Sequence, residues 1–116
     1  MDNDLQSLTQ ALRDFAEARD WAQFHSPKNL ASALSVEAAE LLEHFQWLTE
    51  AQSQSLNADK KAEVAAEAAD VLLYLLQLCD KLDIDLVEAA RLKMVVNARK
   101  YPVASARGSS QKHKAA

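Results

Sequence analysis

The chain has almost none of the residues that tight turns and hairpins require. Its 116 residues include one glycine and two prolines, whereas β-turns and hairpins use Gly, Pro, Asn and Asp at defined positions. Residues that favour helices, such as alanine, leucine, glutamate and lysine, are abundant. The composition therefore excludes a β-sandwich or barrel and predicts an all-α fold, with nearly half of the residues apolar and able to form a core.

Other absences narrow the class of protein. Cys79 is the single cysteine, so no disulfide can form within the chain. The sequence has no apolar run long enough to cross a bilayer, and its N-terminus lacks a basic-then-apolar signal pattern, so we expect a cytoplasmic protein without a membrane partner. The net charge of -4 is unusual for a reader of duplex DNA, and we expect no nucleic acid partner.

Apolar residues recur at helical spacing in four segments. The segments cover about residues 5–19, 29–47, 58–82 and 86–101. Pro27 marks the loop after the first segment, and Asp85 with Glu88 forms a capping box before the fourth. We predict one domain over residues 1–104, followed by a flexible basic tail at 105–116.

Two acidic pairs lie within the apolar stripes of the second and third segments. Glu37 and Glu40 are three residues apart, as are Glu67 and Asp70, so each pair presents two carboxylates on one helix face. Apolar residues at helical spacing precede and follow Glu37 and Glu67. Both glutamates are therefore expected to point towards the core.

Several ionised carboxylates are costly to bury unless a proton or a cation neutralises them. Ligation by oxygen alone favours Mg²⁺, or Mn²⁺, over zinc, which prefers Cys and His. One Glu-x-x-Glu pair is commonly part of a solvated helix face. Two such pairs in apolar stripes predict a shared metal site with Glu37, Glu40, Glu67 and Asp70 as ligands.

Aromatic and basic residues accompany the acidic pairs. Trp47 and Tyr74 share the faces of the acids and suit a stacking platform for a base, although core packing explains either ring as well. In the first loop, Trp21, Phe24 and His25 could close over a base. On the last helix, Lys93, Asn97 and Lys100 could contact phosphate. A loop histidine or a solvated basic face is the simpler interpretation of each group alone.

The run Val71–Leu76 is apolar around the whole helix circumference. Both sides of this helix therefore need apolar partners. We expect a homo-oligomer in which a second subunit covers one side. A monomer with one central helix is the alternative.

Four motifs occur in order along the chain, together with the paired acids. They are Arg19-Asp20-Trp21-x-x-Phe24-His25-x-Pro27-x-Asn29-Leu30, Phe45-Gln46-Trp47, Asp70-Val71-Leu72-x-Tyr74-Leu75 and Lys93-Met94-x-x-Asn97-x-x-Lys100-Tyr101-Pro102. With the acidic spacing, the set resembles the all-α nucleoside triphosphate pyrophosphohydrolases of the MazG-like superfamily, and within it the dCTP pyrophosphatase group. The resemblance spans about residues 5–110.

This resemblance implies Mg²⁺-dependent hydrolysis of a nucleoside triphosphate, a deoxycytidine or modified cytidine nucleotide, to the monophosphate and pyrophosphate. It also implies a four-helix MazG-like bundle assembled as a dimer or tetramer. The two acidic pairs match the family's catalytic metal ligands. The implied substrate contacts are Trp21, Phe24, His25, Asn29, Trp47, Tyr74, Lys93, Asn97 and Lys100.

Two other functions compete with this interpretation. A ferritin-like di-metal protein also places carboxylates inside a helix bundle, but it expects Glu-x-x-His on two helices. Here His44 follows Glu40 by four residues, and the third helical segment has no histidine. A non-enzymatic helical interaction module would account for the apolar third segment, but it assigns no role to the inward acids.

Overall fold

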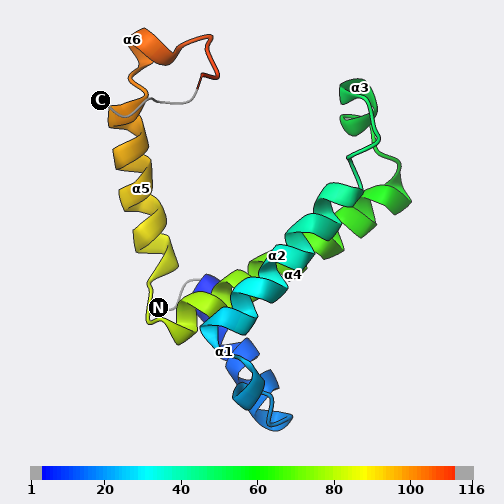
Figure 1. Ribbon diagram of the computed structural model, residues 1–116, viewed down its shortest axis with the longest axis vertical. Helices are drawn as coiled ribbons and strands as arrows, with labels where there is room; N and C mark the ends of the chain where they lie inside the picture. Colours follow the sequence, from blue (N-terminus) through cyan, green and yellow to red (C-terminus); the bar gives the residue numbers. More distant parts are fainter. Residues whose placement is uncertain (1–3, 112–116) are drawn as a thin grey trace. The chain divides into compact units, whose positions relative to one another are not determined.

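The computed structural model describes residues 4–111, and each regular element in that range is a helix (Figure 1). The chain divides into two compact units, Met1–Asp83 and Ile84–Ala116. The elements of the first unit are α1 (Asp4–Ala18), the short 3-10 helix η1 (Ala22–Phe24), α2 (Pro27–Glu43), α3 (Glu50–Ser53) and α4 (Ala58–Lys81). Those of the second are α5 (Leu86–Lys100) and α6 (Val103–Ala106). The predicted all-α fold is confirmed.

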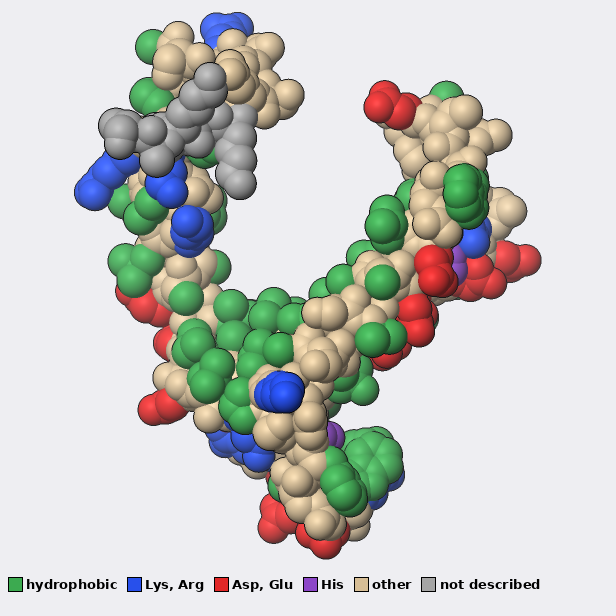
Figure 2. All heavy atoms as spheres, in the orientation of Figure 1, with side chains coloured by type: hydrophobic (Ala, Val, Ile, Leu, Met, Phe, Trp, Pro, Cys, Tyr) green, Lys and Arg blue, Asp and Glu red, His purple; other side chains and the backbone are tan. Residues whose placement is uncertain are grey.

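The long helix α4 organises the first unit. Helix α2 lies along it, and α1 packs against its C-terminal part (Figure 1). Four buried apolar residues join the three helices: Ala16 from α1, Leu30 from α2, and Leu76 and Cys79 from α4. The core of this unit is therefore small, and much apolar surface on the visible face of α2 and α4 stays open (Figure 2).

Helix α2 begins at Pro27 because the preceding residue caps it. The Ser26 hydroxyl accepts a hydrogen bond from the Asn29 amide at 3.1 Å, and proline at the first helical position has no amide to satisfy. The helix ends at Glu43, four residues before the predicted end at Trp47. Turns connect α2 to α3. Thr49 adopts an extended conformation and forms the capping box that starts α3, so α2 cannot continue to this residue.

Helix α4 has the predicted start, and it ends at Lys81, one residue before the predicted end. The Asn57 side chain accepts from the Lys60 amide at 2.8 Å and caps its first turn. At the other end Asp83 adopts a left-handed conformation with φ of 55°. This conformation is typical of the residue that stops a helix, where glycine or asparagine is more usual.

In the second unit, Asp85 accepts from the Glu88 amide at 3.1 Å and so caps α5, which is one half of the predicted capping box. Arg99 and Lys100 lie in the last turn, where cations interact favourably with the helix dipole. Helix α6 spans the predicted boundary between domain and tail at 104/105. Residues 112–116 of the predicted tail lie outside the described residues, so that division stays a prediction.

Over residues 4–111, no helix combines the length and the apolar character that membrane crossing requires.

Replacing Leu30 by alanine should lower the free energy of unfolding by about 2–5 kcal/mol, because this side chain is 1% exposed and its loss leaves a cavity between α2 and α4. Chemical denaturation followed by circular dichroism measures the change. Ser32→Ala, at an exposed position of the same helix, is the matched control and should shift stability by about 0.5 kcal/mol or less. Equal effects of the two substitutions would contradict the assignment of Leu30 to the core.

Candidate metal centre

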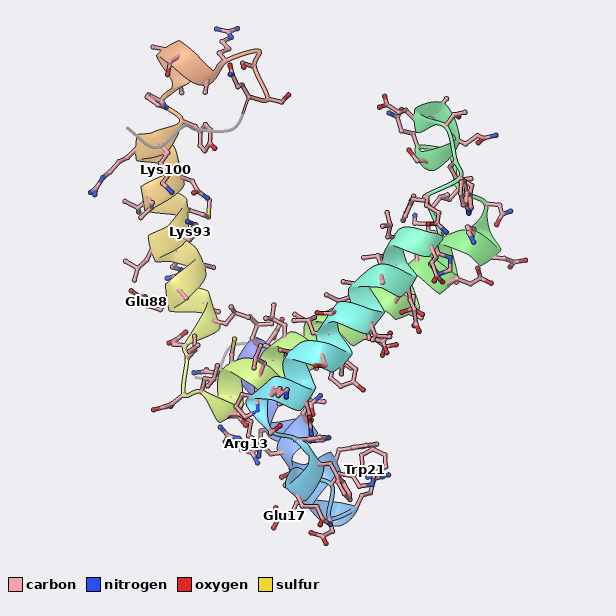
Figure 3. The ribbon with its side chains drawn as sticks, in the orientation of Figure 1. Arg13, Glu17, Trp21, Glu88, Lys93 and Lys100 are labelled. Carbon is pink, nitrogen blue, oxygen red and sulfur yellow. The ribbon has the colours of Figure 1, made fainter. Side chains whose placement is uncertain are left out.

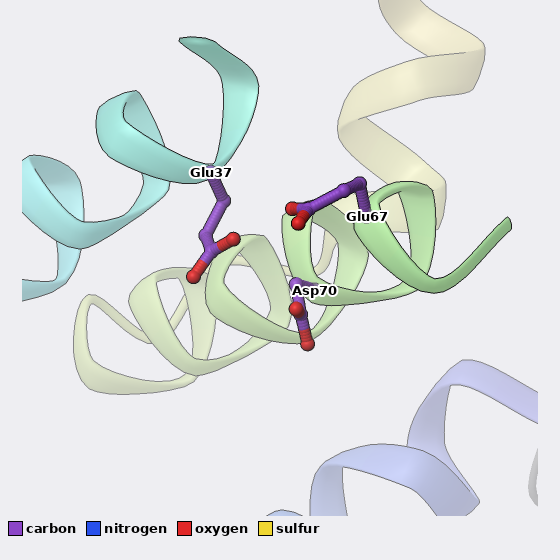
Figure 4. Close-up of side chains that lie close together, drawn as sticks. All are labelled: Glu37, Glu67 and Asp70. Carbon is purple, nitrogen blue, oxygen red and sulfur yellow. The ribbon is translucent and has the colours of Figure 1, made fainter. Parts of the chain in front are cut away.

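Three carboxylates converge between α2 and α4 in the first unit. Glu37 comes from α2, and Glu67 and Asp70 come from consecutive turns of α4 (Figure 4). One carboxylate oxygen of each lies within 4.8 Å of the others. The three acids form the cluster that we call the acid centre.

The helices place two of these acids at a partly buried position. Glu37 and Glu67 are half-buried, whereas Asp70 is exposed. The Oε2 atoms of Glu37 and Glu67 are fully buried and accept no hydrogen bond from any described residue. Buried polar atoms without a partner are rare in folded proteins, so these two oxygens call for a ligand or a proton.

Protonation is favoured at this position. The pKa of Glu37 is raised, first because a proton on its carboxyl can be shared with Glu67, and next because burial disfavours the charged form. The pKa of Glu40 is raised because a proton on its carboxyl can be shared with Glu37 and because of the charge of that residue. Like charges crowd the site, and either a proton or a cation would relieve their repulsion.

The donor set fits a hard divalent cation. Oxygens around Mg²⁺ at bonds of about 2.1 Å are roughly 3–4 Å apart, a separation within the 4.8 Å that bounds the acid centre. The three acids supply only oxygen, and no histidine or cysteine joins them in the described residues. Such a set suits Mg²⁺ or Mn²⁺ and does not suit zinc.

Glu40 lies one turn beyond Glu37 on α2 and is half-buried, but it is outside the tightest group of three. Glu63 is also outside it. Its Oε2 lies 3.9 Å from His44 Nδ1 and 3.6 Å from Lys60 Nζ. His44 is therefore engaged one turn or more away from the acid centre, which disfavours a Glu and His site of the ferritin type.

The predicted aromatic residues of the first loop form an exposed group at one end of the unit. Trp21 packs edge-on against Phe15, with ring centroids 5.7 Å apart, and Arg19 lies 3.6 Å over the Phe15 ring. Figure 3 shows Trp21 at this end of the unit. Phe24 is 60% exposed. These rings are open to contact with a planar ligand or with another chain.

Other predicted site residues of this unit are placed differently. Asn29 donates its side-chain amide to the Phe24 carbonyl at 2.9 Å and so holds the loop in shape. Trp47 follows the C-terminal end of α2 and is 85% exposed. Tyr74 is half-buried, one turn after Asp70 on α4. The structure thus brings Tyr74 near the acid centre, and it puts Trp21 and Trp47 at opposite ends of α2.

The predicted phosphate-binding strip lies on α5, in the second unit. Lys93, Asn97 and Lys100 are exposed, and their spacing puts them on one face of the helix. Figure 3 labels Lys93 and Lys100 on α5.

A cavity that the sequence did not predict opens in the first unit. Its volume is about 280 Å³, and α1, the loop before α2 and the C-terminal half of α4 line it. His25 is the predicted site residue that belongs to its wall. An ion pair between Arg13 and Asp80 also lines it. These two residues are 67 positions apart, and no local sequence signal links them.

In the metal-free protein, stability should depend on pH through the acid centre. The raised pKa of Glu37 means that the stabilisation is complete below its ordinary value of 4.5 and is lost as pH rises through the raised value. Asp80 acts at a different pH. Its pKa is lowered by Arg13, so its contribution is lost only as pH falls below 3.8. Melting temperatures in EDTA between pH 4 and 8 test this expectation.

The matched variants are Glu37→Gln, which should flatten this pH dependence, and Glu50→Gln, an exposed acid of α3, which should preserve it. A pH profile of Glu37→Gln that matches the unmodified protein would show that Glu37 is not the titrating group.

Comparisons with known proteins agree with this architecture. The chain is 40% identical to dCTP pyrophosphatase 1 of Homo sapiens over 111 residues, which are 94% of this chain and 65% of the human protein. It is 39% identical to the same enzyme of Bos taurus over 111 residues, 94% of this chain and 66% of the bovine protein. The chain therefore spans slightly less than two thirds of these relatives' length.

A solved pyrophosphatase from Archaeoglobus fulgidus has a similar structure, with a TM-score of 0.73 and 43% identity. The match covers 88% of this chain and 95% of that one. The profile of the MazG-like family matches residues 32–115, a range that includes both acidic pairs. The fold, the acidic pairs and these relatives agree, and the chain belongs to the MazG-like family.

Proposed function

We propose that this protein is a Mg²⁺-dependent nucleoside triphosphate pyrophosphohydrolase. Its substrate would be dCTP or a modified dCTP, cleaved to the monophosphate and pyrophosphate. The acid centre carries the proposal, because two of its buried oxygens have no hydrogen-bond partner and its three acids suit a hard cation. The mammalian relatives are dCTP pyrophosphatases and the solved neighbour is a pyrophosphatase, which supports this reaction and this substrate.

In this proposal Glu37, Glu67 and Asp70 hold the cation, and Mn²⁺ can replace Mg²⁺. The bound ion would neutralise charge on the triphosphate and lower the pKa of a water molecule. Glu40 is within one turn of Glu37 and outside the tightest group, so its carboxylate is available as a fourth ligand or as the acceptor of a proton from water. A carboxylate free of the metal is the stronger base.

We further propose that the protein acts as a homo-oligomer. Helix α2 has 17 residues and is about 25 Å long, with Trp21 and Phe24 before its start and Trp47 after its end. One base cannot contact both groups of rings on a single chain. Phe24 is 60% exposed and Trp47 is 85% exposed. Contact with a second copy would bury these rings and so stabilise the assembly.

The same proposal assigns phosphate contacts to Lys93, Asn97 and Lys100, and base contacts to Trp21, His25 and Tyr74. A cytoplasmic location would place the enzyme with its nucleotide substrate. A helical interaction module is the alternative, and a titration with Mg²⁺ distinguishes the two. A ligand that binds the folded state raises the melting temperature, whereas a module without a metal site would show no such rise.

Hydrolysis of a panel of canonical and modified nucleoside triphosphates tests the reaction. We expect pyrophosphate and monophosphate from a cytidine deoxynucleotide in the presence of Mg²⁺, and none in EDTA. Glu40→Gln should lower turnover by about 100-fold or more, because proton transfer by a positioned group contributes about this much. The circular dichroism spectrum should be unchanged. Near-normal turnover of the Glu40→Gln protein would show that Glu40 is not part of the catalytic site.

Sedimentation equilibrium at micromolar concentration tests the assembly. We expect a dimer or a tetramer, and we expect Trp47→Ser to weaken it because an exposed indole is lost from the contact. Lys28→Ser, at another exposed position of the first unit, is the control and should leave the assembly unchanged. A monomer at all concentrations would contradict the proposed assembly.

A further inference from the structure

The cavity of the first unit is large enough to hold a planar ring. Its volume of about 280 Å³ is near the lower end of ligand pockets, about 300 Å³. It is therefore large enough for a nucleobase. Its walls combine apolar positions such as Leu12 and Ala16 with the polar side chains of Arg13, Gln77 and Asp80.

One face of α4 connects the acid centre to this cavity. Asp70, Tyr74, Gln77 and Lys81 follow each other at four-, three- and four-residue steps, so they share a face of the helix. Gln77 and Lys81 line the cavity. Gln77 lies about 10 Å beyond Asp70 along the helix axis. A nucleotide with its phosphates at the acid centre can thus extend along α4 and put its base in the cavity.

The cavity's polar wall is held in a fixed geometry. The Arg13 guanidinium donates from Nε to Asp80 Oδ2 at 2.9 Å and from Nη2 to Asp80 Oδ1, and from Nη1 to Gln10 at 3.3 Å. Figure 3 shows Arg13 on the first unit. A fork with two hydrogen bonds restricts the guanidinium far more than one bond would. Arg13 also keeps the pKa of Asp80 below its usual value, so the carboxylate stays charged.

The pair offers donors and acceptors side by side. Three of the five N–H groups of Arg13 are used in these bonds, and two remain. The Asp80 carboxylate has lone pairs beyond the two that Arg13 occupies. A base edge with one donor next to one acceptor can therefore bond to both residues at once.

We propose that the Arg13–Asp80 pair selects the base, with Asp80 accepting from the exocyclic amine of an aminopyrimidine and Arg13 donating to its ring N3. This inference rests on the proposed function and specifies its substrate. Uracil presents the opposite order, a carbonyl acceptor where cytosine has its amine, and an N–H donor at N3. Because the sugar and phosphates fix how the base enters, the order of donor and acceptor in the pair distinguishes the two bases.

The test compares kcat/KM for dCTP and dUTP in Mg²⁺. The unmodified protein should prefer dCTP. The double variant R13E/D80R keeps an ion pair between α1 and α4 but exchanges donor and acceptor, so the preference should shift towards dUTP by about tenfold or more. Arg13→Lys keeps the charge and loses the fork. The Arg13 side chain is more than half exposed, so the Arg13→Lys protein should still fold. This substitution should reduce the preference for dCTP.

Binding of non-hydrolysable dCTP and dUTP analogues, measured by calorimetry, gives the same comparison without turnover. Arg91→Ala, at an exposed arginine of α5, is the control and should keep the preference. A structural role of the pair would change the melting temperature and leave the ratio of the two nucleotides unchanged. If the unmodified protein hydrolyses triphosphates but either has no base preference or keeps it in Arg13→Lys and in R13E/D80R, the pair does not select the base. If no triphosphate is hydrolysed, the proposed function itself is wrong.

Discussion

The crowding of carboxylates between α2 and α4 is the constraint on which the rest of this protein depends. Glu37 and Glu67 each carry a buried oxygen without a hydrogen-bond partner, and Asp70 lies within 4.8 Å of both. Two helices that pack along each other would normally fill such a position with apolar side chains. Here the position holds like charges, which are tolerated only with a shared proton or a bound cation. The three acids of this helix pair could therefore hold a metal ion.

The hydrophobic core of the first unit is small, so polar contacts and exposed apolar rings matter more for how its helices pack. Among residues 4–111, four side chains are buried, and of these Leu30 alone is both large and almost fully enclosed. The tie between α1 and α4 relies in part on the ion pair of Arg13 and Asp80, which also lines the cavity. Apolar rings such as Trp47 stay exposed. In the proposed homo-oligomer, a second copy of the chain would cover such surface.

Much of the fold could be predicted from the sequence because its signals are local. The near absence of glycine and proline disfavours hairpins and sandwiches, and the predicted cap at Asp85 marks where α5 starts. The start of α2 at Pro27 lies two residues before the predicted start at Asn29. The end of α2 was predicted four residues too late, because apolar spacing continues through Trp47 while the Thr49 capping box already directs the chain into α3. The apolar pattern could not reveal this competition between neighbouring helix signals.

The sequence predicted part of the candidate site. The three-residue spacing of Glu37 and Glu67 with their partner acids predicts shared helix faces, and three of the four predicted acids lie together in the acid centre, whereas Glu40 lies outside the tightest group. The cavity could not be predicted, since Arg13 and Asp80 are 67 residues apart and only packing of α1 on α4 brings them together. The placement of Trp21 before α2 and of Trp47 after it follows from the predicted helical segment at residues 29–47, because Trp21 precedes that segment and Trp47 ends it.

The most direct test of the acid centre is equilibrium binding of Mn²⁺, followed by the electron paramagnetic resonance signal of the free ion. The account predicts a saturable site in the unmodified protein from which Mg²⁺ displaces Mn²⁺. In Glu67→Gln the affinity should fall by at least about tenfold, or about 1.4 kcal/mol, because one charged ligand is lost. Binding of equal strength in both proteins, or no binding in either, would contradict the claim that these carboxylates exist to hold a cation.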